Sequence, residues 1–202
     1  MLPKLSPVSA STVMAVVLPI NGFDNFYSKS FQTPEMDAFE KGLMSPAEFR
    51  DYIRKITAHP LSDQQVDDIV NAILLDVPRD RVTLLLAVRQ HYRTFLFSNT
   101  NQINYDHFYP LLLDRYGFDI FERCFERAYF SMFIHTRKPS TEGFLRIINE
   151  NNLNPKETIF IDDIAVNAQA ARQVGLYAHH LTEPDISYLF DKDFRLNPTF
   201  TV

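Results

Sequence analysis

Cysteine is almost absent from this sequence of 202 residues, since Cys124 is the only one. This excludes an internal disulfide and a cysteine-based zinc site, and it favours a reducing, cytoplasmic location. Long apolar runs are also missing, because no stretch approaches the ~20 residues of a membrane span. The chain has no cluster of Lys or Arg, and its formal net charge is −5. We therefore expect a protein that binds neither nucleic acid nor membrane.

The rest of the composition is ordinary for a globular protein, with 46% hydrophobic and 22% charged residues. Apolar runs of strand length alternate with segments of helical periodicity from residue 79 onwards, which predicts an α/β fold with a parallel sheet. We expect strands at 94–97, 124–131, 158–161 and 177–181. We expect helices at 79–92, 105–116, 140–151 and 165–174, and a short helix near the C-terminus.

The first third of the chain reads differently. Ser45-Pro46-Ala47-Glu48 has the pattern of a capping box with proline at the first helical position, and Ser62 opens a second helix. Residues 21–39 read as a loop, and the apolar residues 13–18 read as a strand or a packed tail. We expect an atypical segment at 1–20, a small helical unit at 21–77 and an α/β core at 78–202.

Polar residues stand at the carboxyl ends of predicted strands or just beyond them. Ser98 and Asn99 follow the strand at 94–97, Lys138 precedes Pro139, and Asp162 and Asp163 follow the strand at 158–161. In an open parallel sheet these residues meet at one edge, where such sheets bind ligands. A hydroxyl and an amide N–H, a fixed positive charge and a pair of carboxylates that favours Mg²⁺ together suit a phosphoryl group.

Each of these residues also has a simpler interpretation. A serine or an aspartate at a strand end often caps the following helix, and a lysine before proline is commonly a solvated charge. His179-His180 lacks a third metal ligand, and Cys124 fits a small buried hydrophobe. The order of the three motifs, with helices between them, is what favours a site.

The three motifs resemble those of the haloacid dehalogenase-like hydrolases. The segments concerned are Phe97-Ser98-Asn99-Thr100-Asn101, Arg137-Lys138-Pro139, and Phe160-Ile161-Asp162-Asp163 with Asn167. They are similar to the second, third and fourth motifs of the sugar-phosphatase branch that includes glucose-1-phosphate phosphatases. The resemblance implies a Rossmann-like core with a helical cap inserted near the N-terminus, and a phosphorylated small metabolite as substrate.

The resemblance also implies a role for each matching residue. Ser98 and the Asn99 backbone would hold the phosphoryl oxygens, and Lys138 would neutralise them. Asp163 would be the main Mg²⁺ ligand, with Asp162 second or acting through water. Asn167 would orient these carboxylates from the following helix. The cap would close over the substrate and select it.

The family's first motif, an aspartate nucleophile at the end of the first strand, is not found. The first carboxylate in the chain is Asp24, which has no apolar strand directly before it. Either the N-terminal segment is missing or replaced, or the chain is a non-catalytic family member that binds or regulates. A carbon-centred hydrolase of the dehalogenase type is a third alternative, which needs the same aspartate. We therefore expect a Mg²⁺-dependent phosphatase fold with little or no activity in this chain.

Overall fold

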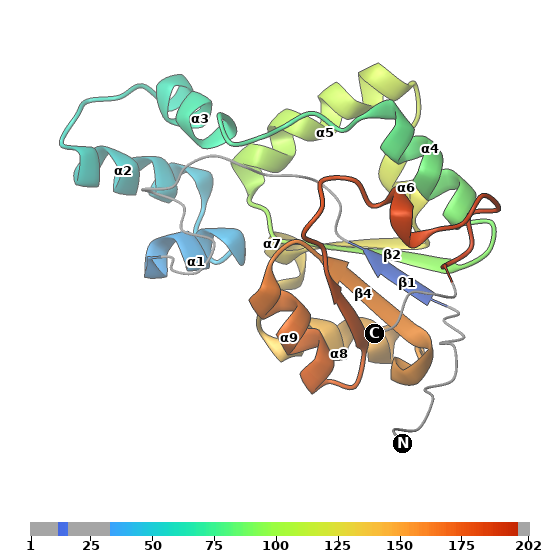
Figure 1. The fold of residues 1–202 in the computed structure, drawn as a ribbon. Helices are drawn as coiled ribbons and strands as arrows, with labels where there is room; N and C mark the ends of the chain where they lie inside the picture. Colours follow the sequence, from blue (N-terminus) through green and yellow to red (C-terminus); the bar gives the residue numbers. More distant parts are fainter. Residues whose placement is uncertain (1–11, 16–32, 198–202) are drawn as a thin grey trace.

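The computed structural model describes residues 12–15 and 33–197, and within these ranges five parallel strands form one sheet. Their order is β3-β2-β1-β4-β5, so β1 lies between β2 and β4 at the centre (Figure 1). The strands are β1 (Thr12–Ala15), β2 (Arg93–Ser98), β3 (Arg127–Phe130), β4 (Thr158–Asp162) and β5 (Tyr177–His180). The predicted α/β fold with a parallel sheet is confirmed.

Helices cover both faces of this sheet (Figure 1). The helices of the core are α4 (Arg79–Val88), α5 (Gln102–Tyr116), α6 (Ile120–Cys124), α7 (Ser131–Ile134), α8 (Thr141–Glu150) and α9 (Ala165–Gln173). Two 3₁₀ turns, η1 (Pro155–Glu157) and η2 (Ser187–Leu189), complete it. None of the helices in the described ranges is long and apolar enough to traverse a bilayer.

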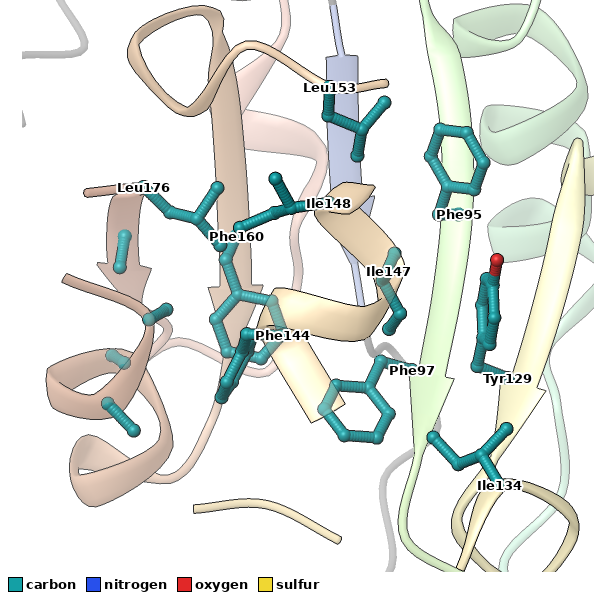
Figure 2. Close-up of a cluster of buried hydrophobic side chains, with 14 residues drawn as sticks. Phe95, Phe97, Tyr129, Ile134, Phe144, Ile147, Ile148, Leu153, Phe160 and Leu176 are labelled. Carbon is teal, nitrogen blue, oxygen red and sulfur yellow. The ribbon is translucent and has the colours of Figure 1, made fainter. Parts of the chain in front are cut away.

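Side-chain alternation along the strands divides the core into layers. Phe95 and Phe97 of β2 and Phe160 of β4 point to the face covered by α8 and α9, where Phe144 and Ile147 meet them (Figure 2). Side chains between these positions point to the opposite face, against α4, α5 and α6 or the C-terminal segment; they include Leu96, Ile159 and Ile161. A sheet buried on both faces explains why its strands read as continuous apolar runs.

A separate helical unit lies to one side of the sheet (Figure 1). It contains α1 (Pro34–Glu40), α2 (Pro46–Thr57) and α3 (Asp63–Asn71). Ser45 and Ser62 each form a capping box, as predicted. Its apolar side chains form a cluster that also includes Ile103 of α5, and in this cluster the stacked rings of Phe39 and Phe49 lie 4.0 Å apart. These helices fall inside the predicted range 21–77, whose division from the core stays a prediction.

The first helix of this unit is attached to the core. His135 Nδ1 lies 2.8 Å from the carbonyl oxygen of Lys41. Gly42 follows with a φ of +65°, and a Cβ atom at this position would lie 2.3 Å from the Met132 carbonyl oxygen. Glycine permits both the positive φ and the close approach. The turn after α1 is therefore fitted directly against α7.

Several predicted boundaries were wrong for local reasons. Residues 34–39 are helical rather than looped, because the Thr33 side chain accepts a hydrogen bond from the Met36 N–H and starts α1. The strand predicted at 124–131 is shorter, since Cys124 ends α6 and Ser131 begins α7. The helix predicted at 79–92 ends at Val88.

Three apolar side chains that share the helical spacing of buried neighbours are exposed. They are Ile56 at 44%, Ile69 at 39% and Leu145 at 45% of their full accessible surface. Each lies within one helical turn of a buried apolar side chain, so helical periodicity alone makes the buried face too wide. The predicted strand at 13–18 is described only over β1, and its remaining positions lie outside the described residues.

Candidate functional site

Ser98, the last residue of β2, lies at the carboxyl edge of the sheet. Its side chain is buried. The loop that follows is held to the neighbouring strand end, because the Thr100 N–H donates to Ser131 Oγ at 2.9 Å and Ser131 Oγ donates to the Thr100 carbonyl oxygen. Asn101 then caps α5 by accepting from the Asn104 N–H. Ser98 itself is therefore not the helix cap that the simpler interpretation proposed.

Asn99 joins two of the sequence motifs. Its Nδ2 donates to the carbonyl oxygen of Lys138, and the Lys138 N–H donates to its Oδ1, both at 2.9 Å. One side-chain amide thus satisfies both backbone groups of a residue 39 positions away. This pair of hydrogen bonds fixes the loop that carries Lys138 relative to the strand end that carries Ser98.

Lys138 is not a solvated surface charge. Its side chain is 3% exposed and Nζ lies 2.8 Å from Oδ2 of Asp162, which is 1% exposed. Nζ also lies 5.5 and 5.6 Å from the ring centres of Phe97 and Phe160, within the range of a cation–π interaction. A buried ion pair of this kind depends on further hydrogen bonds to its charged atoms.

Asp162 has those further hydrogen bonds. Its Oδ1 accepts from Asn167 Nδ2 at 3.0 Å and from the Ile164 N–H at 2.8 Å. Asn167 is itself buried in the first turn of α9. The structure therefore brings Lys138, Asp162 and Asn167 into one cluster, with the carboxylate facing inward.

Asp163, the next residue, is exposed at the same strand end. Its carbonyl oxygen lies 3.2 Å from Nε2 of His180. Within the part of the chain that the structure describes, no three His, Cys, Asp or Glu side chains gather as a metal site. Mg²⁺ is nevertheless commonly held by one or two carboxylates with water and substrate phosphate, so the exposed carboxylate of Asp163 suits such an ion, whereas both oxygens of Asp162 already accept hydrogen bonds.

Sequence reasoning missed one acid beside the site. Glu40, at the end of α1, is 1% exposed, and its Oε2 lies 2.6 Å from Nε of Arg137. Asp37 Oδ1 lies 3.5 Å from the same guanidinium. Burial raises the pKa of Glu40 to about 7, against the lowering effect of Arg137 and, more weakly, of Lys138. In the sequence Glu40 stands before Lys41 and Gly42 in a segment that reads as a turn. That pattern gave no indication that the Glu40 side chain is buried.

The raised pKa of Glu40 predicts a pH-dependent stability. Below about pH 4.5 the carboxyl is neutral in both states, but between pH 4.5 and 7 the unfolded chain loses this proton while the native one keeps it. This contribution to the free energy of unfolding is therefore complete below pH 4.5 and is lost as the pH rises through 7, by up to about 3 kcal/mol. Glu40→Gln removes that decline.

Urea denaturation at pH 5, 6, 7 and 8 measures the effect. The stability of Glu40→Gln relative to the unchanged chain should rise across this range. Glu35→Gln, on the same helix but nearer to solvent, provides the matched control. A constant difference between Glu40→Gln and the unchanged chain at all four pH values would contradict the assignment.

Two other candidates have no role at this edge. His179 lies on the last strand, and its Nε2 is 2.7 Å from the Tyr188 hydroxyl. Cys124 is buried, and burial raises the pKa of its thiol to about 11, which leaves it a small apolar side chain at neutral pH.

A family model described as haloacid dehalogenase-like hydrolase matches residues 20–175. The chain is 24% identical over 152 residues to the D-ribitol-5-phosphate phosphatase of Bacteroides thetaiotaomicron, covering 75% of this chain and 73% of that protein. It is 32% identical over 106 residues to the sesquiterpene phosphatase astK of Aspergillus oryzae, covering 52% of each.

Solved structures of related proteins indicate the same family. One is a HAD family enzyme from Bacteroides thetaiotaomicron, crystallised as an aspartate-to-alanine variant with magnesium and inorganic phosphate. It matches with a TM-score of 0.82 and 30% identity, covering 91% of this chain and all of that one. With a family model over most of its length and a structural neighbour of this similarity, the chain belongs to the haloacid dehalogenase-like hydrolases.

Proposed function

We propose that the carboxyl edge of this sheet binds a phosphomonoester together with Mg²⁺. The observation that carries the proposal is the Asn99 amide pair, which fixes the loop of Lys138 relative to Ser98. A dianionic phosphoryl group needs hydrogen-bond donors, a positive charge and a cation. Ser98, Lys138 and the two aspartates supply those parts at the carboxyl edge of the sheet, where β1 lies between the strands that end in Ser98 and Asp162.

Each residue has a proposed role. The Ser98 hydroxyl and the Asn99 N–H donate to phosphoryl oxygens, and Lys138 adds positive charge. Asp163 binds Mg²⁺ from its exposed position, with Asp162 as a second ligand or acting through water. Asn167 holds Asp162 in place. Magnesium in the related crystal structure supports this choice of ion, and when bound it would neutralise charge on the phosphoryl oxygens.

The helices α1 to α3 are proposed to act as the cap. Their position beside the sheet supports this role, as does an apolar cluster formed mainly by their own side chains, with Ile103 of α5. Since Glu40 contacts Arg137, next to Lys138, the cap is joined to the site through one buried ion pair. The organic part of the substrate and a cytoplasmic location stay predictions.

Catalysis is proposed to be weak or lost. The described part of β1 is Thr12–Ala15, and in the sequence neither these residues nor residues 16–23 include an Asp or Glu. The non-catalytic binding alternative is favoured by this feature. The dehalogenase alternative is not, because it needs the same aspartate and gives no role to the Asp162–Asp163 pair.

Binding of inorganic phosphate tests the proposal without requiring turnover. We expect calorimetric titration to give tighter phosphate binding with Mg²⁺ than without it. Ser98→Ala should weaken binding about tenfold or more, because a hydrogen bond to a charged group is lost. Asp163→Asn should remove the effect of Mg²⁺, whereas Asp193→Asn, an exposed acid in the C-terminal turn, should not. Equal phosphate affinity in all these proteins would reject the site.

A further inference from the structure

A pocket of about 260 Å³ opens beside Ser98. One wall is the segment that joins α3 to α4, and the opposite wall is one face of α5. Ser98, at the end of β2, and Thr100, in the loop that follows, also line the pocket. The pocket therefore shares a residue with the proposed phosphate site and continues away from it.

The walls of this pocket are mostly apolar. Six large apolar side chains line it: Leu74, Leu75, Val77, Phe108, Leu111 and Leu112. Leu75 and Leu111, which line the pocket, are 50% and 57% exposed. A bound apolar group would cover this exposed surface. Exposed apolar side chains gathered at a pocket are typical of a binding site.

Polar groups of the pocket are few and partly engaged. Arg115 forms an ion pair with Asp76, so both charges have a partner in the described structure. His107 and the hydroxyls of Ser98 and Thr100 remain as polar atoms of the lining. A ligand rich in hydroxyl groups would lose hydrogen bonds to water here and regain few.

We infer that this pocket receives the apolar part of a phosphomonoester whose phosphoryl group lies at Ser98 and Lys138. The ligand class is an alkyl or alicyclic phosphate rather than a sugar phosphate. About eight carbon atoms fill the pocket, if each takes roughly the 30 Å³ of a water molecule in the liquid. The inference rests on the proposed function, because Ser98 joins the two parts of the site.

Calorimetric titration with methyl, butyl and hexyl phosphate tests this inference in the presence of Mg²⁺. Affinity should rise about fourfold for each added methylene group that is buried. Hexyl phosphate is thus expected to bind at least about 100-fold more tightly than methyl phosphate, after allowing for incomplete burial. Ribitol 5-phosphate should bind no more tightly than methyl phosphate.

Two leucines of α5 give a matched pair of variants. Leu111 and Leu113 are both exposed, at 57% and 43%, but only Leu111 lines the pocket. Leu111→Ser should weaken hexyl phosphate binding about tenfold and leave methyl phosphate unaffected. Leu113→Ser should change neither. Because both side chains are exposed, both variants should fold.

The outcomes separate the inference from the function on which it rests. If methyl and hexyl phosphate bind equally, or ribitol 5-phosphate binds most tightly, the apolar pocket assignment is overturned while the phosphate site stands. If none of the phosphates binds but hexanol does, and Leu111→Ser weakens it, the pocket assignment holds and the phosphate site fails. Equal effects of Leu111→Ser and Leu113→Ser would also overturn the pocket assignment.

Discussion

The purified chain is expected to hydrolyse p-nitrophenyl phosphate on the order of 10⁴- to 10⁶-fold more slowly than the ribitol-5-phosphate phosphatase relative under the same conditions. The family's route needs an aspartate at the end of the first strand, where it forms an aspartyl-phosphate. Here β1 is described over Thr12–Ala15, and the first side-chain carboxylate in the sequence is Asp24. Binding of the phosphoryl group without a nucleophile lowers the activation barrier to hydrolysis only slightly.

Two controls identify the source of any activity. The rate is measured with and without Mg²⁺, and again with Asp163→Ala. If the residual hydrolysis changes neither when Mg²⁺ is removed nor in Asp163→Ala, it comes from outside the proposed site. Hydrolysis that needs both Mg²⁺ and Asp163 would contradict the expectation, and it would make Asp24 the first candidate for the nucleophile.

Breaking the buried pair of Lys138 and Asp162 is expected to cost about 3–5 kcal/mol of the free energy of unfolding. Lys138→Met leaves the 1%-exposed carboxylate of Asp162 without its counter-charge. Asp162→Asn leaves a buried ammonium between the rings of Phe97 and Phe160. Each single variant thus strands one charge in a medium of low dielectric constant, which is why the cost is large.

A double-mutant cycle in urea measures the pair. The variant that carries both Lys138→Met and Asp162→Asn should be more stable than the sum of the single changes predicts, because no charge is left unpaired. Arg93→Met serves as the control, since its pair with Glu126 is 42% and 44% exposed and should be worth less than about 1 kcal/mol. Additive effects of Lys138→Met and Asp162→Asn would contradict the coupling.

Much of this protein was readable from local sequence. The capping box at Ser45, the helix start at Ser62 and the strands predicted at 94–97 and 158–161 depend on neighbouring residues, so short patterns predicted them to within one residue. The three motifs that carry the family resemblance are also continuous stretches. Helix starts that depend on a single cap, such as Thr33 for α1, were missed because many threonines do not cap.

Only the tertiary structure showed how differently the two adjacent aspartates are placed. Successive side chains at a strand end point to opposite sides, so Asp162 is buried against Lys138 while Asp163 reaches solvent. The family resemblance implied a different role for each, but no local pattern in the sequence indicated which of the two is buried. The sequence likewise gives no sign that Asn99 binds the backbone of Lys138, a contact that follows from the neighbouring positions of two loops.

The sequence by itself determined the fold class, the family and the residue types at the sheet edge, because these follow from local periodicity and continuous motifs. The tertiary structure decided the contact of Glu40 with Arg137, 97 positions apart, and the apolar pocket beside Ser98. Both arise where separate elements meet. Burial there raises the pKa of a carboxyl group, and incomplete packing there leaves a pocket. Neither property belongs to any one segment of the chain.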